Sequence, residues 1–435
     1  MSASRFDPSG PLRGTLRPPP DKSVSHRAAL IAAMADGETT IDGYLDSADT
    51  LSTLVAMRRL GAQVEGPAAG PPAISFRMRV RGIGLRGLAE ASIDVGNAGT
   101  LLRLLPGWLA GQETGSWTLD GDSSIRRRPV DRIAEPLRLM GAQLRCREDR
   151  LPPLEIDGAP LRGVSYELPV ASAQVKSCLL FAGLLAEGET QVVEPLPSRD
   201  HTERMLAAAG AEVERRDGAV VAVRPAQRLE PGEIAVPADF SSAAFFLVAA
   251  LLVPGSDITL SGVGLNPTRT GLLQILARMG AEVEVEPEGE RGGEPAGRLR
   301  VRSAELRGTE VAGADVPLAI DELPLVALAA CFAEGETTIR DAAELRRKES
   351  DRIAVVAEVL NGLGGEVEPT ADGMRILGGG GLRGGSAFSH GDHRVAMLGA
   401  IAGLASTQGV EVEGMGAAAV SYPGFEADLA MLLGS

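Results

Sequence analysis

The chain has 435 residues, of which 44% are hydrophobic and 23% are charged, a composition typical of a globular protein with two or three domains. Its formal net charge of −15 argues against a nucleic-acid-binding protein, because such a protein presents a basic face. Only three of the 43 basic residues are lysines, namely Lys22, Lys176 and Lys348. A lysine ammonium is a compact charge with a tunable pKa, so these three positions are candidates for chemistry.

The cysteines and the N-terminus bear on cellular location. Cys146, Cys178 and Cys331 lie far apart, so the sequence predicts neither a disulfide framework nor a thiolate zinc site. The first residues lack the basic start and apolar core of a signal peptide, and the longest apolar run, 243–253, is too short to span a bilayer. We therefore expect a cytoplasmic protein that does not associate with membranes.

One pattern recurs six times along the chain: an apolar helix, a glycine and a short strand rich in Thr or Val. The copies occupy residues 29–43, 104–121, 179–194, 246–262, 324–341 and 397–414. The first helix of each copy is apolar nearly all round and should be buried, whereas a second, amphipathic helix should cover it. Six copies could form one ring or two clusters of three, and the periodicity does not choose between them.

The amphipathic helices end at a glycine that is followed at once by a strand. These segments are 58–64, 138–144, 207–213, 277–283 and 361–367, with a truncated sixth copy at 425–435. The stretches 66–72 and 287–297, rich in glycine and proline, are expected to be hairpin loops within copies.

The first polar motif is DKSVSHR, residues 21–27, which follows three prolines and begins the first helix. Asp21 or Ser23 can cap this helix, and helical spacing places Lys22 near His26 and Ser23 near Arg27. The cationic groups and the free N–H groups of the first turn would converge on an anion. A capped and solvated first turn is the alternative interpretation.

Residues 92–103 predict a strand, a glycine turn and an apolar helix. Gly99 would let the backbone approach a ligand closely, and Asn97 and Arg103 could supply side-chain partners, although this pattern taken alone favours a plain strand-to-helix turn over a site. Three arginines then precede Pro129. Arg128, held by that proline, could clamp a phosphate or carboxylate with two parallel hydrogen bonds, but a solvated charge run is the usual meaning.

Two neighbouring segments, SAQVKS (172–177) and LPSRDHTERM (196–205), combine hydroxyls, an amide, Lys176 and Arg199 with predicted helix starts. These groups suit a phosphate. Helix capping alone would explain the serines equally well.

In AIDELP (319–324), Asp321 and Glu322 stand between apolar residues just before a buried helix. A carboxylate in apolar surroundings suits a general base, and an ordinary helix cap is the alternative.

RRKESDR (346–352) is expected to place Lys348, Glu349 and Arg352 on one side of the first turns of a helix, with a surface ion-pair ladder as the alternative. In HGDHR (390–394) two histidines lie three apart, but nothing nearby supplies further metal ligands, so Arg394 as an anion clamp is the favoured interpretation.

In this order, the motifs DKSVSHR, GNAGT, RRRP, SAQVKS, SRDHTE, DELP, RRKESDR and GDHR closely resemble those of 5-enolpyruvylshikimate-3-phosphate synthases, over almost the whole chain. The resemblance implies an α/β (α+β) fold of two domains, an inverse αβ barrel-like arrangement in which each domain has three βαβαββ-type units. It further implies domains of residues 22–240 and of 1–21 with 241–435, with the active site in the cleft between domains.

The implied reaction transfers the enolpyruvyl (1-carboxyvinyl) group of phosphoenolpyruvate to the 5-hydroxyl of shikimate 3-phosphate and releases phosphate, by way of a tetrahedral intermediate. It belongs to the shikimate pathway, which leads to chorismate and the aromatic amino acids. The resemblance implies no metal and no organic cofactor, two small anionic substrates as the only partners, and a monomer. It also implies a target of glyphosate, which we expect to fit because Gly99 adds no methyl group to crowd it.

The resemblance also implies roles for individual residues. Asp321 is the implied base for the 5-hydroxyl, helped by Lys348, while Glu349 is the candidate for proton transfer at the methylene carbon and Lys22 is a further catalytic cation. The residues implied to bind shikimate 3-phosphate are Lys22, Ser23, Arg27, Ser172, Ala173, Gln174, Arg199, Asp321 and Lys348. Those implied to bind phosphoenolpyruvate are Lys22, Asn97, Gly99, Arg128, Gln174, Arg352 and Arg394.

Two departures from the family pattern stand out. Residues 420–423, Val-Ser-Tyr-Pro, replace a segment in which many members have a lysine. The SRDHTE motif resembles a divergent subgroup that often tolerates glyphosate and commonly has alanine where this chain has Gly99.

Three rival interpretations fit less well. The sister enolpyruvyl transferase that acts on UDP-N-acetylglucosamine relies on a loop cysteine, and none of the three cysteines lies in a polar motif here. A six-unit clamp around DNA would need a basic inner surface. A non-catalytic descendant would have no need to keep Asp321, Lys348 and Glu349.

Overall fold

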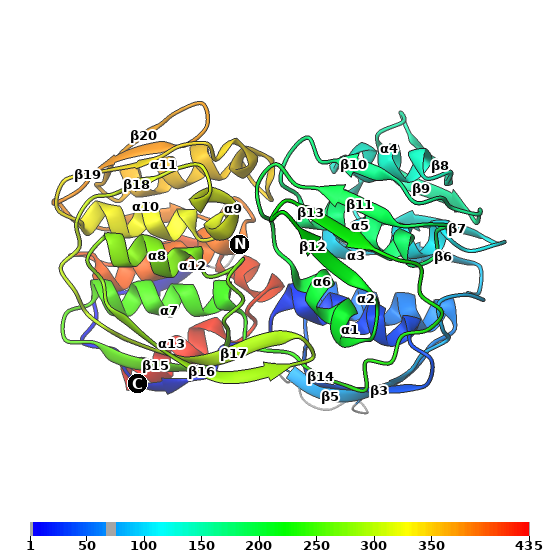
Figure 1. Ribbon diagram of the computed structural model, residues 1–435. Helices are drawn as coiled ribbons and strands as arrows, with labels where there is room; N and C mark the ends of the chain where they lie inside the picture. The colour runs from blue at the N-terminus through cyan, green and yellow to red at the C-terminus, as the bar shows by residue number, and fades with distance from the viewer. Residues whose placement is uncertain (1–2, 67–74, 435) are drawn as a thin grey trace. The chain divides into compact units, whose positions relative to one another are not determined.

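Six small β-sheets with their helices form the architecture of the computed structural model, which describes residues 3–66 and 75–434 (Figure 1). The sheets are divided between two units, with three in each. The N-terminal unit comprises Pro20–Pro237 together with Glu290–Glu294, and the C-terminal unit takes the rest of the described chain. Each unit holds three copies of the repeat, so the copies form two clusters of three and not one ring. The predicted fold class is confirmed.

In the N-terminal unit, three apolar helices are buried and three amphipathic helices cover them. The buried helices are α1 (Lys22–Met34), α3 (Gly99–Ala110) and α5 (Ala173–Gly183), and the covering ones are α2 (Ala48–Leu60), α4 (Asp131–Leu139) and α6 (His201–Ala208). The sheets have the strand orders β14-β3-β5-β4, β6-β7-β9-β8 and β10-β11-β13-β12. Their strands are β3 (Glu38–Leu45), β4 (Gln63–Glu65), β5 (Ser75–Arg81), β6 (Ala91–Asp94), β7 (Ser116–Asp120), β8 (Gln143–Arg147), β9 (Leu151–Asp157), β10 (Ser165–Glu167), β11 (Thr190–Val193), β12 (Val213–Arg216), β13 (Val220–Val223) and β14 (Glu233–Ala235).

The C-terminal unit repeats this plan. Its buried helices are α7 (Phe240–Leu252), α10 (Leu323–Phe332) and α12 (His393–Ala405), and its other helices are α8 (Gly271–Arg278), α9 (Asp315–Ala319), α11 (Arg352–Gly362) and α13 (Phe425–Leu433). The sheet orders are β16-β17-β15-β2, β18-β19-β21-β20 and β1-β23-β22. The strands are β1 (Ala3–Phe6), β2 (Arg13–Leu16), β15 (Asp257–Gly264), β16 (Val283–Arg291), β17 (Glu294–Arg302), β18 (Glu310–Val311), β19 (Glu336–Ile339), β20 (Glu366–Pro369), β21 (Met374–Leu377), β22 (Gly385–Phe388) and β23 (Val410–Glu413).

Helix burial follows from the apolar sequences, as predicted. Side chains from Val24 to Met34 of α1 are all buried, and the same holds for α7 from Phe240 to Leu251. Each unit therefore has its own hydrophobic core. Figure 1 shows α7, α10 and α12 side by side in the C-terminal unit. In the N-terminal unit α3 and α5 approach so closely that a Cβ on Gly107 would lie 2.0 Å from the carbonyl oxygen of Cys178.

In each sheet, one edge strand pairs in parallel with the strand that follows the buried helix. In four of the six sheets this edge strand is also the last strand before the buried helix in the chain, so the two strands and the helix form a βαβ crossover. Distant segments complete three of the six copies. β14, near the end of the N-terminal unit, pairs with β3, and β2 pairs with β15. The last copy is truncated, and β1 pairs antiparallel with β23 where the other copies place a strand of their own hairpin.

The predicted hairpin at 287–297 is confirmed, with Gly292 and Gly293 in left-handed conformations between β16 and β17. Most of that stretch is strand, because both strands extend almost to the turn. For the predicted loop at 66–72, only Gly66 lies within the described residues. Within the described chain, no helix combines the length and the apolar character needed to cross a membrane.

Candidate active site

The first polar motif forms the first turn of α1, as predicted. The side chain of Asp21 caps the helix by accepting a hydrogen bond of 2.9 Å from the Val24 amide. Lys22 is the first helical residue, and its ammonium lies 3.2 Å from a carboxylate oxygen of Asp49. Asp49 in turn lies in the first turn of α2. The two helix starts therefore present a lysine that is only partly buried.

Arg27 is buried, and its guanidinium donates to neutral oxygens. It donates to the Thr202 hydroxyl at 2.7 Å, the Ser177 hydroxyl at 2.9 Å and the Ser23 carbonyl at 3.0 Å. Burial lowers the pKa of Arg27 to about 10, with Glu203 acting in the opposite direction and Arg199 in the same one. The group stays charged near neutrality, and within the described residues it forms no ion pair, so its charge is available to an anion.

The start of α3 has a comparable arrangement. Arg128 donates to the Asn97 side-chain oxygen at 2.8 Å and to the Ser124 hydroxyl at 3.3 Å, and both acceptors are neutral. A Cβ on Gly99 would lie 2.8 Å from an Nη of Arg128 and 3.1 Å from one of Arg103. The two guanidinium groups therefore border the free N–H groups of the α3 start, where an anion is favoured.

The start of α5 is linked by contacts to both of these places. Ser172 caps α5 by accepting from the Val175 amide at 3.4 Å, and Ala173 and Gln174 form the first turn. The Gln174 amide contacts the Thr100 hydroxyl of α3 at 3.4 Å, while Ser177 holds Arg27. Arg199 lies just before α6, close enough to Arg27 to affect its pKa. We call these residues the N-terminal cluster; it consists of Lys22, Ser23, Arg27, Asn97, Gly99, Arg128, Ser172, Ala173, Gln174 and Arg199.

In the C-terminal unit, four cationic side chains surround Asp321. Its carboxylate lies 3.2 Å from Arg352, 3.3 Å from Lys348, and 3.7 Å from both Arg394 and Arg269. We call Asp321, Lys348, Glu349, Arg352 and Arg394, together with Arg269, Asp239, Glu322 and Asp392, the C-terminal cluster. In contrast with Arg27 and Arg128, its cations are paired with carboxylates.

Arg352 is the most deeply buried cation of the C-terminal cluster. Its guanidinium side chain is only 1% exposed and contacts Glu349 at 2.7 Å and Asp392 at 2.8 Å as well as Asp321. Burial acts to lower the pKa of Arg352, but the three carboxylates outweigh it and raise that pKa above its ordinary value. For Asp392, burial acts to raise the pKa, and the charge and hydrogen bonds of Arg352 outweigh it, so the pKa is lowered.

One sequence-based expectation about this cluster is wrong. Lys348 and Glu349 do not lie in the first turns of a helix, because α11 begins only at Arg352, where Asp351 caps it by accepting from the Ala354 amide at 3.2 Å. Lys348 follows a short 3-10 helix, Ala343–Arg347, in an extended conformation. Lys348 nevertheless pairs with Asp321, and Glu349 pairs with Arg352, so these side chains still belong to one cluster.

Sequence reasoning missed several members of the C-terminal cluster. Arg269 donates to Asp239 at 3.1 Å and to the Ser241 hydroxyl at 2.8 Å, and that hydroxyl donates to Glu322. The repeat itself carries a usable signal, because Asp239 immediately precedes the buried helix α7 as Asp21 precedes α1 and Asp392 precedes α12. Similarly, Arg269 precedes α8 as Arg128 precedes α4.

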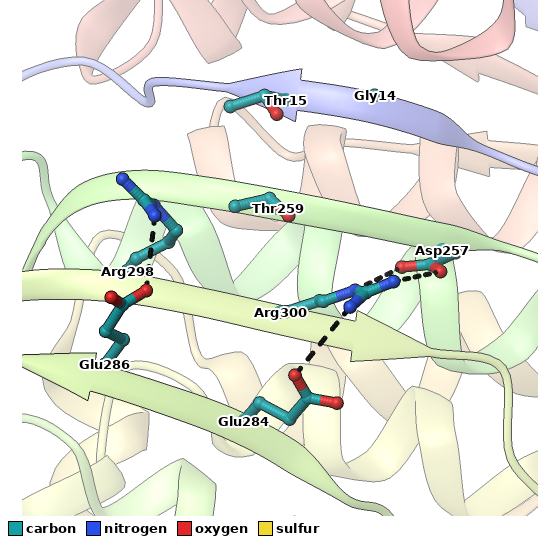
Figure 2. Close-up of a pocket in the computed structure, with 8 residues that line it drawn as sticks. All are labelled: Gly14, Thr15, Asp257, Thr259, Glu284, Glu286, Arg298 and Arg300. Atoms are coloured by element: carbon teal, nitrogen blue, oxygen red, sulfur yellow. Dashed lines mark hydrogen bonds and ion pairs between the residues drawn. The ribbon is translucent and has the colours of Figure 1, made fainter.

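A hollow of about 480 Å³ lies elsewhere, over the sheet β16-β17-β15-β2 (Figure 2). Figure 2 shows its charged side chains paired with one another, with Arg300 on Asp257 at 2.8 Å and Arg298 on Glu286 at 3.2 Å. None of the predicted site residues lines it. We assign this hollow to the ion-paired outer face of the sheet.

The two histidines of HGDHR lie in different surroundings. His390 contacts Glu358 at 3.3 Å, and His393 begins α12 with its ring 3.9 Å from Asp392. Among the described side chains, no group of three His, Cys, Asp or Glu residues is placed to hold a metal ion.

Comparison with known proteins identifies the family. Residues 6–429 match the model of EPSP synthase (3-phosphoshikimate 1-carboxyvinyltransferase). A 3-phosphoshikimate 1-carboxyvinyltransferase of Alkalilimnicola ehrlichii is 52% identical over 421 residues, which is 96% of this chain and 93% of that protein. The protein of the same name from Methylococcus capsulatus is 49% identical over 430 residues, 98% of this chain and 96% of its own length.

Solved structures agree with these relatives. An EPSP synthase from Acinetobacter baumannii superposes with a TM-score of 0.88 at 43% identity and covers 98% of this chain and 97% of that one. The enolpyruvyl transferase NikO from Streptomyces tendae has a TM-score of 0.78 at 18% identity, with 99% and 97% covered, and shows the shared fold alone.

Proposed function

The chain belongs to the EPSP synthase (3-phosphoshikimate 1-carboxyvinyltransferase) family and transfers the enolpyruvyl group of phosphoenolpyruvate to shikimate 3-phosphate, and we propose that the N-terminal and C-terminal clusters together carry this reaction. The observation that carries the proposal is the charge of the two clusters. Among the described residues, the guanidinium groups of Arg27 and Arg128 donate to neutral oxygens and form no ion pair, and four cations surround the carboxylate of Asp321. Such groups recognise small polyanions in a protein that is acidic as a whole.

Shikimate 3-phosphate binds to the N-terminal cluster through its carboxylate, its phosphate and its ring. Ser23 and Arg27 hold its carboxylate. The start of α5, with Ser172, the Ala173 backbone and Gln174, surrounds its phosphate and ring together with Arg199. This assignment is supported by the buried guanidinium of Arg27 and by the free N–H groups of a helix start, which favour a phosphate.

Phosphoenolpyruvate draws on both clusters. Lys22 and Arg128 contact its phosphate, Gly99 lets the ligand lie against the backbone, and Asn97 orients Arg128. Arg352 and Arg394 hold its carboxylate, and Gln174 lies against both substrates. Because Arg352 and Arg394 both pair with Asp321, the substrate carboxylate must share or replace that partner.

Two groups move protons. Asp321 accepts the proton of the 5-hydroxyl, so the oxygen can attack the substituted carbon of phosphoenolpyruvate. Glu349 delivers a proton to the methylene carbon, which becomes a methyl group in the tetrahedral intermediate, and removes one when phosphate leaves. Lys348 and Lys22 stabilise the negative charge that develops at the attacking and leaving oxygens.

The Lys22→Ala variant tests the proposal. Removal of a cation that stabilises the leaving phosphate is expected to lower kcat/KM by about 10²- to 10³-fold. Lys22 is 25% exposed, so its loss should leave the fold intact. Phosphate release from shikimate 3-phosphate and phosphoenolpyruvate measures the rate, with Arg79→Ala, an exposed arginine of the same unit, as the matched control. Equal phosphate-release rates in the two variants would show that the role assigned to Lys22 is wrong.

A methyl group at position 99 tests the phosphoenolpyruvate assignment. In Gly99→Ala the new Cβ would meet Arg128 at 2.8 Å, so this flexible side chain must shift. We expect the KM for phosphoenolpyruvate to rise about tenfold while the KM for shikimate 3-phosphate changes little. Millimolar glyphosate should inhibit the wild type. A higher concentration of glyphosate should be required to inhibit the variant to the same extent. A wild-type rate unchanged at millimolar glyphosate would contradict the expected fit.

We also propose that the enzyme is a cytoplasmic monomer. The support is the family resemblance together with the three cysteines, which are all free thiols. Sedimentation of the purified protein tests the monomer directly.

A further inference from the structure

Lys176 is a buried ammonium group that the proposed reaction does not use. It lies in the first turns of α5, and its side chain is 0% exposed. The ammonium contacts Glu194 at 2.9 Å, Glu203 at 2.7 Å and the Ser198 carbonyl oxygen at 3.3 Å. The buried ammonium thus lies within ion-pair distance of two carboxylates and donates a hydrogen bond to the Ser198 carbonyl, and such pairing is the condition under which a buried charge is tolerated.

The surroundings of Lys176 are balanced in charge. Arg215, at the edge of the group, lies 3.0 Å from Glu194 and 3.6 Å from Glu203. Two cations therefore face two carboxylates. Burial raises the pKa of Glu203, and Lys176 opposes that rise, so the loss of Lys176 would leave Glu203 without its main counter-charge.

This group of charges holds the segment between β11 and α6. Glu194 accepts hydrogen bonds from the Ser198 amide at 3.1 Å and from its hydroxyl, and Lys176 donates to the carbonyl of the same residue. The N–H, the carbonyl and the hydroxyl of Ser198 are thus all fixed by Glu194 and Lys176. The next residue is Arg199, which the proposed function places at shikimate 3-phosphate.

The same charges fix the other end of the segment. Glu203 follows Thr202, whose hydroxyl lies 2.7 Å from Nε of Arg27 and 2.7 Å from the hydroxyl of Ser177. Ser177 follows Lys176 in α5 and also donates to the Ala173 carbonyl at 2.6 Å. Lys176 therefore ties the start of α5 to residues 198–203, and both segments carry groups assigned to one substrate.

We propose that Lys176 is a positioning residue for shikimate 3-phosphate: it sets Arg199 and Arg27 through Ser198, Glu194 and Glu203 and does not touch the substrate. A well-packed apolar side chain can stabilise a protein as well as a buried ion pair does, so stability alone does not explain the lysine. The proposal rests on the roles proposed above for Arg27 and Arg199. It predicts that replacement of Lys176 changes the KM for shikimate 3-phosphate much more than the KM for phosphoenolpyruvate.

The test is the KM of Lys176→Met for each substrate, measured by phosphate release. We expect the KM for shikimate 3-phosphate to rise about tenfold or more, with a much smaller change in kcat and in the KM for phosphoenolpyruvate. The double variant Lys176→Met with Glu203→Gln, in which the missing cation is matched by a missing carboxylate, should recover part of the loss. The defect of the single variant should also shrink as the pH falls, because protonation neutralises Glu203.

The matched control is Gln112→Met, another buried polar residue of the same unit, whose amide donates to the Leu85 and Trp108 carbonyl oxygens. It should lower stability and leave both KM values unchanged. Trp108 and Trp117, the two tryptophans of the chain, lie in this unit, so their fluorescence reports its folding in every variant. If Lys176→Met does not fold, Ser198→Ala takes its place and should raise the same KM several-fold.

The outcomes of these experiments distinguish a failure of the positioning role from a failure of the proposed function. If Arg199→Ala raises the KM for shikimate 3-phosphate and folded Lys176→Met does not, the positioning role is wrong and the function stands. Equal increases in both KM values, or a loss confined to kcat, also overturn the positioning role. If the wild type releases no phosphate in the presence of shikimate 3-phosphate, the proposed function itself fails.

Discussion

Asp321→Asn is expected to lower kcat for enolpyruvyl transfer by about 10²- to 10⁴-fold, the range that a positioned general base contributes. The amide has the size of the carboxylate and still offers an oxygen to Arg352 and Lys348, but it does not accept the proton of the 5-hydroxyl. The KM values should change much less than kcat. Steady-state phosphate release at saturating substrates measures the effect.

The matched control for this variant is Asp315→Asn. Asp315 lies in the same unit and pairs with Arg278 at 2.5 Å outside the cluster. Its replacement should leave kcat unchanged. A rate for Asp321→Asn within about twofold of the wild type would remove Asp321 from the role of base.

Arg352→Met is expected to destabilise the C-terminal unit by about 3–5 kcal/mol, because it leaves buried carboxylates without their shared cation. Asp392 and Asp321 have side chains that are 0% and 11% exposed, and both pair with Arg352. The variant should also lose activity, since the phosphoenolpyruvate carboxylate loses a partner. Urea unfolding followed by circular dichroism measures stability, because both tryptophans lie in the other unit.

The pH dependence of this loss has a defined sign. Asp392 has a lowered pKa in the folded protein, so the stability that it contributes is present above its unfolded pKa of about 4 and is lost as the pH falls through the lower folded value. The difference between wild type and variant should therefore be largest near neutrality and should shrink in acid.

Arg375→Met, which breaks an ion pair on the surface of the same unit, serves as the control and should show no comparable loss. A loss as small as that of the control would mean that the buried ion pairs of Arg352 do not hold the cluster.

The fold was predictable because one period repeats six times. Segments that are apolar all round predicted the buried helices. Segments that end at a glycine predicted the amphipathic helices. What the periodicity left open was the grouping of the copies, since that depends on which distant segments complete each sheet. The pairings of β14 with β3 and of β2 with β15 join segments that the repeat pattern treats as unrelated.

The candidate site was predictable in part for the same reason. Site residues lie at or next to the starts of the helices of the copies, so polar motifs at helix starts singled out Lys22, Gly99, Asp321 and Arg394. Asp239 was missed because its motif, a single aspartate before an apolar helix, is indistinguishable from an ordinary cap unless the copies are aligned.

Partners that are distant in sequence were beyond local reasoning. Arg27 is held by Ser177 and Thr202, which lie 150 and 175 residues further along the chain. Helical spacing also failed at Lys348 and Glu349, because the cap at Asp351 starts the helix later than the charge pattern suggested. In each case a tertiary contact or a cap decided what sequence spacing alone left undecided.

Mass spectrometry of a reaction carried out in D₂O tests the central claim most directly. With shikimate 3-phosphate and phosphoenolpyruvate, the wild type should convert the shikimate compound into a product heavier by one enolpyruvyl group and release phosphate in equal amount. Because Glu349 adds a solvent proton to the methylene carbon and later removes one, deuterium should appear in the vinyl group of that product. Unmodified shikimate 3-phosphate, or phosphate released in its absence at the same rate, would contradict the account.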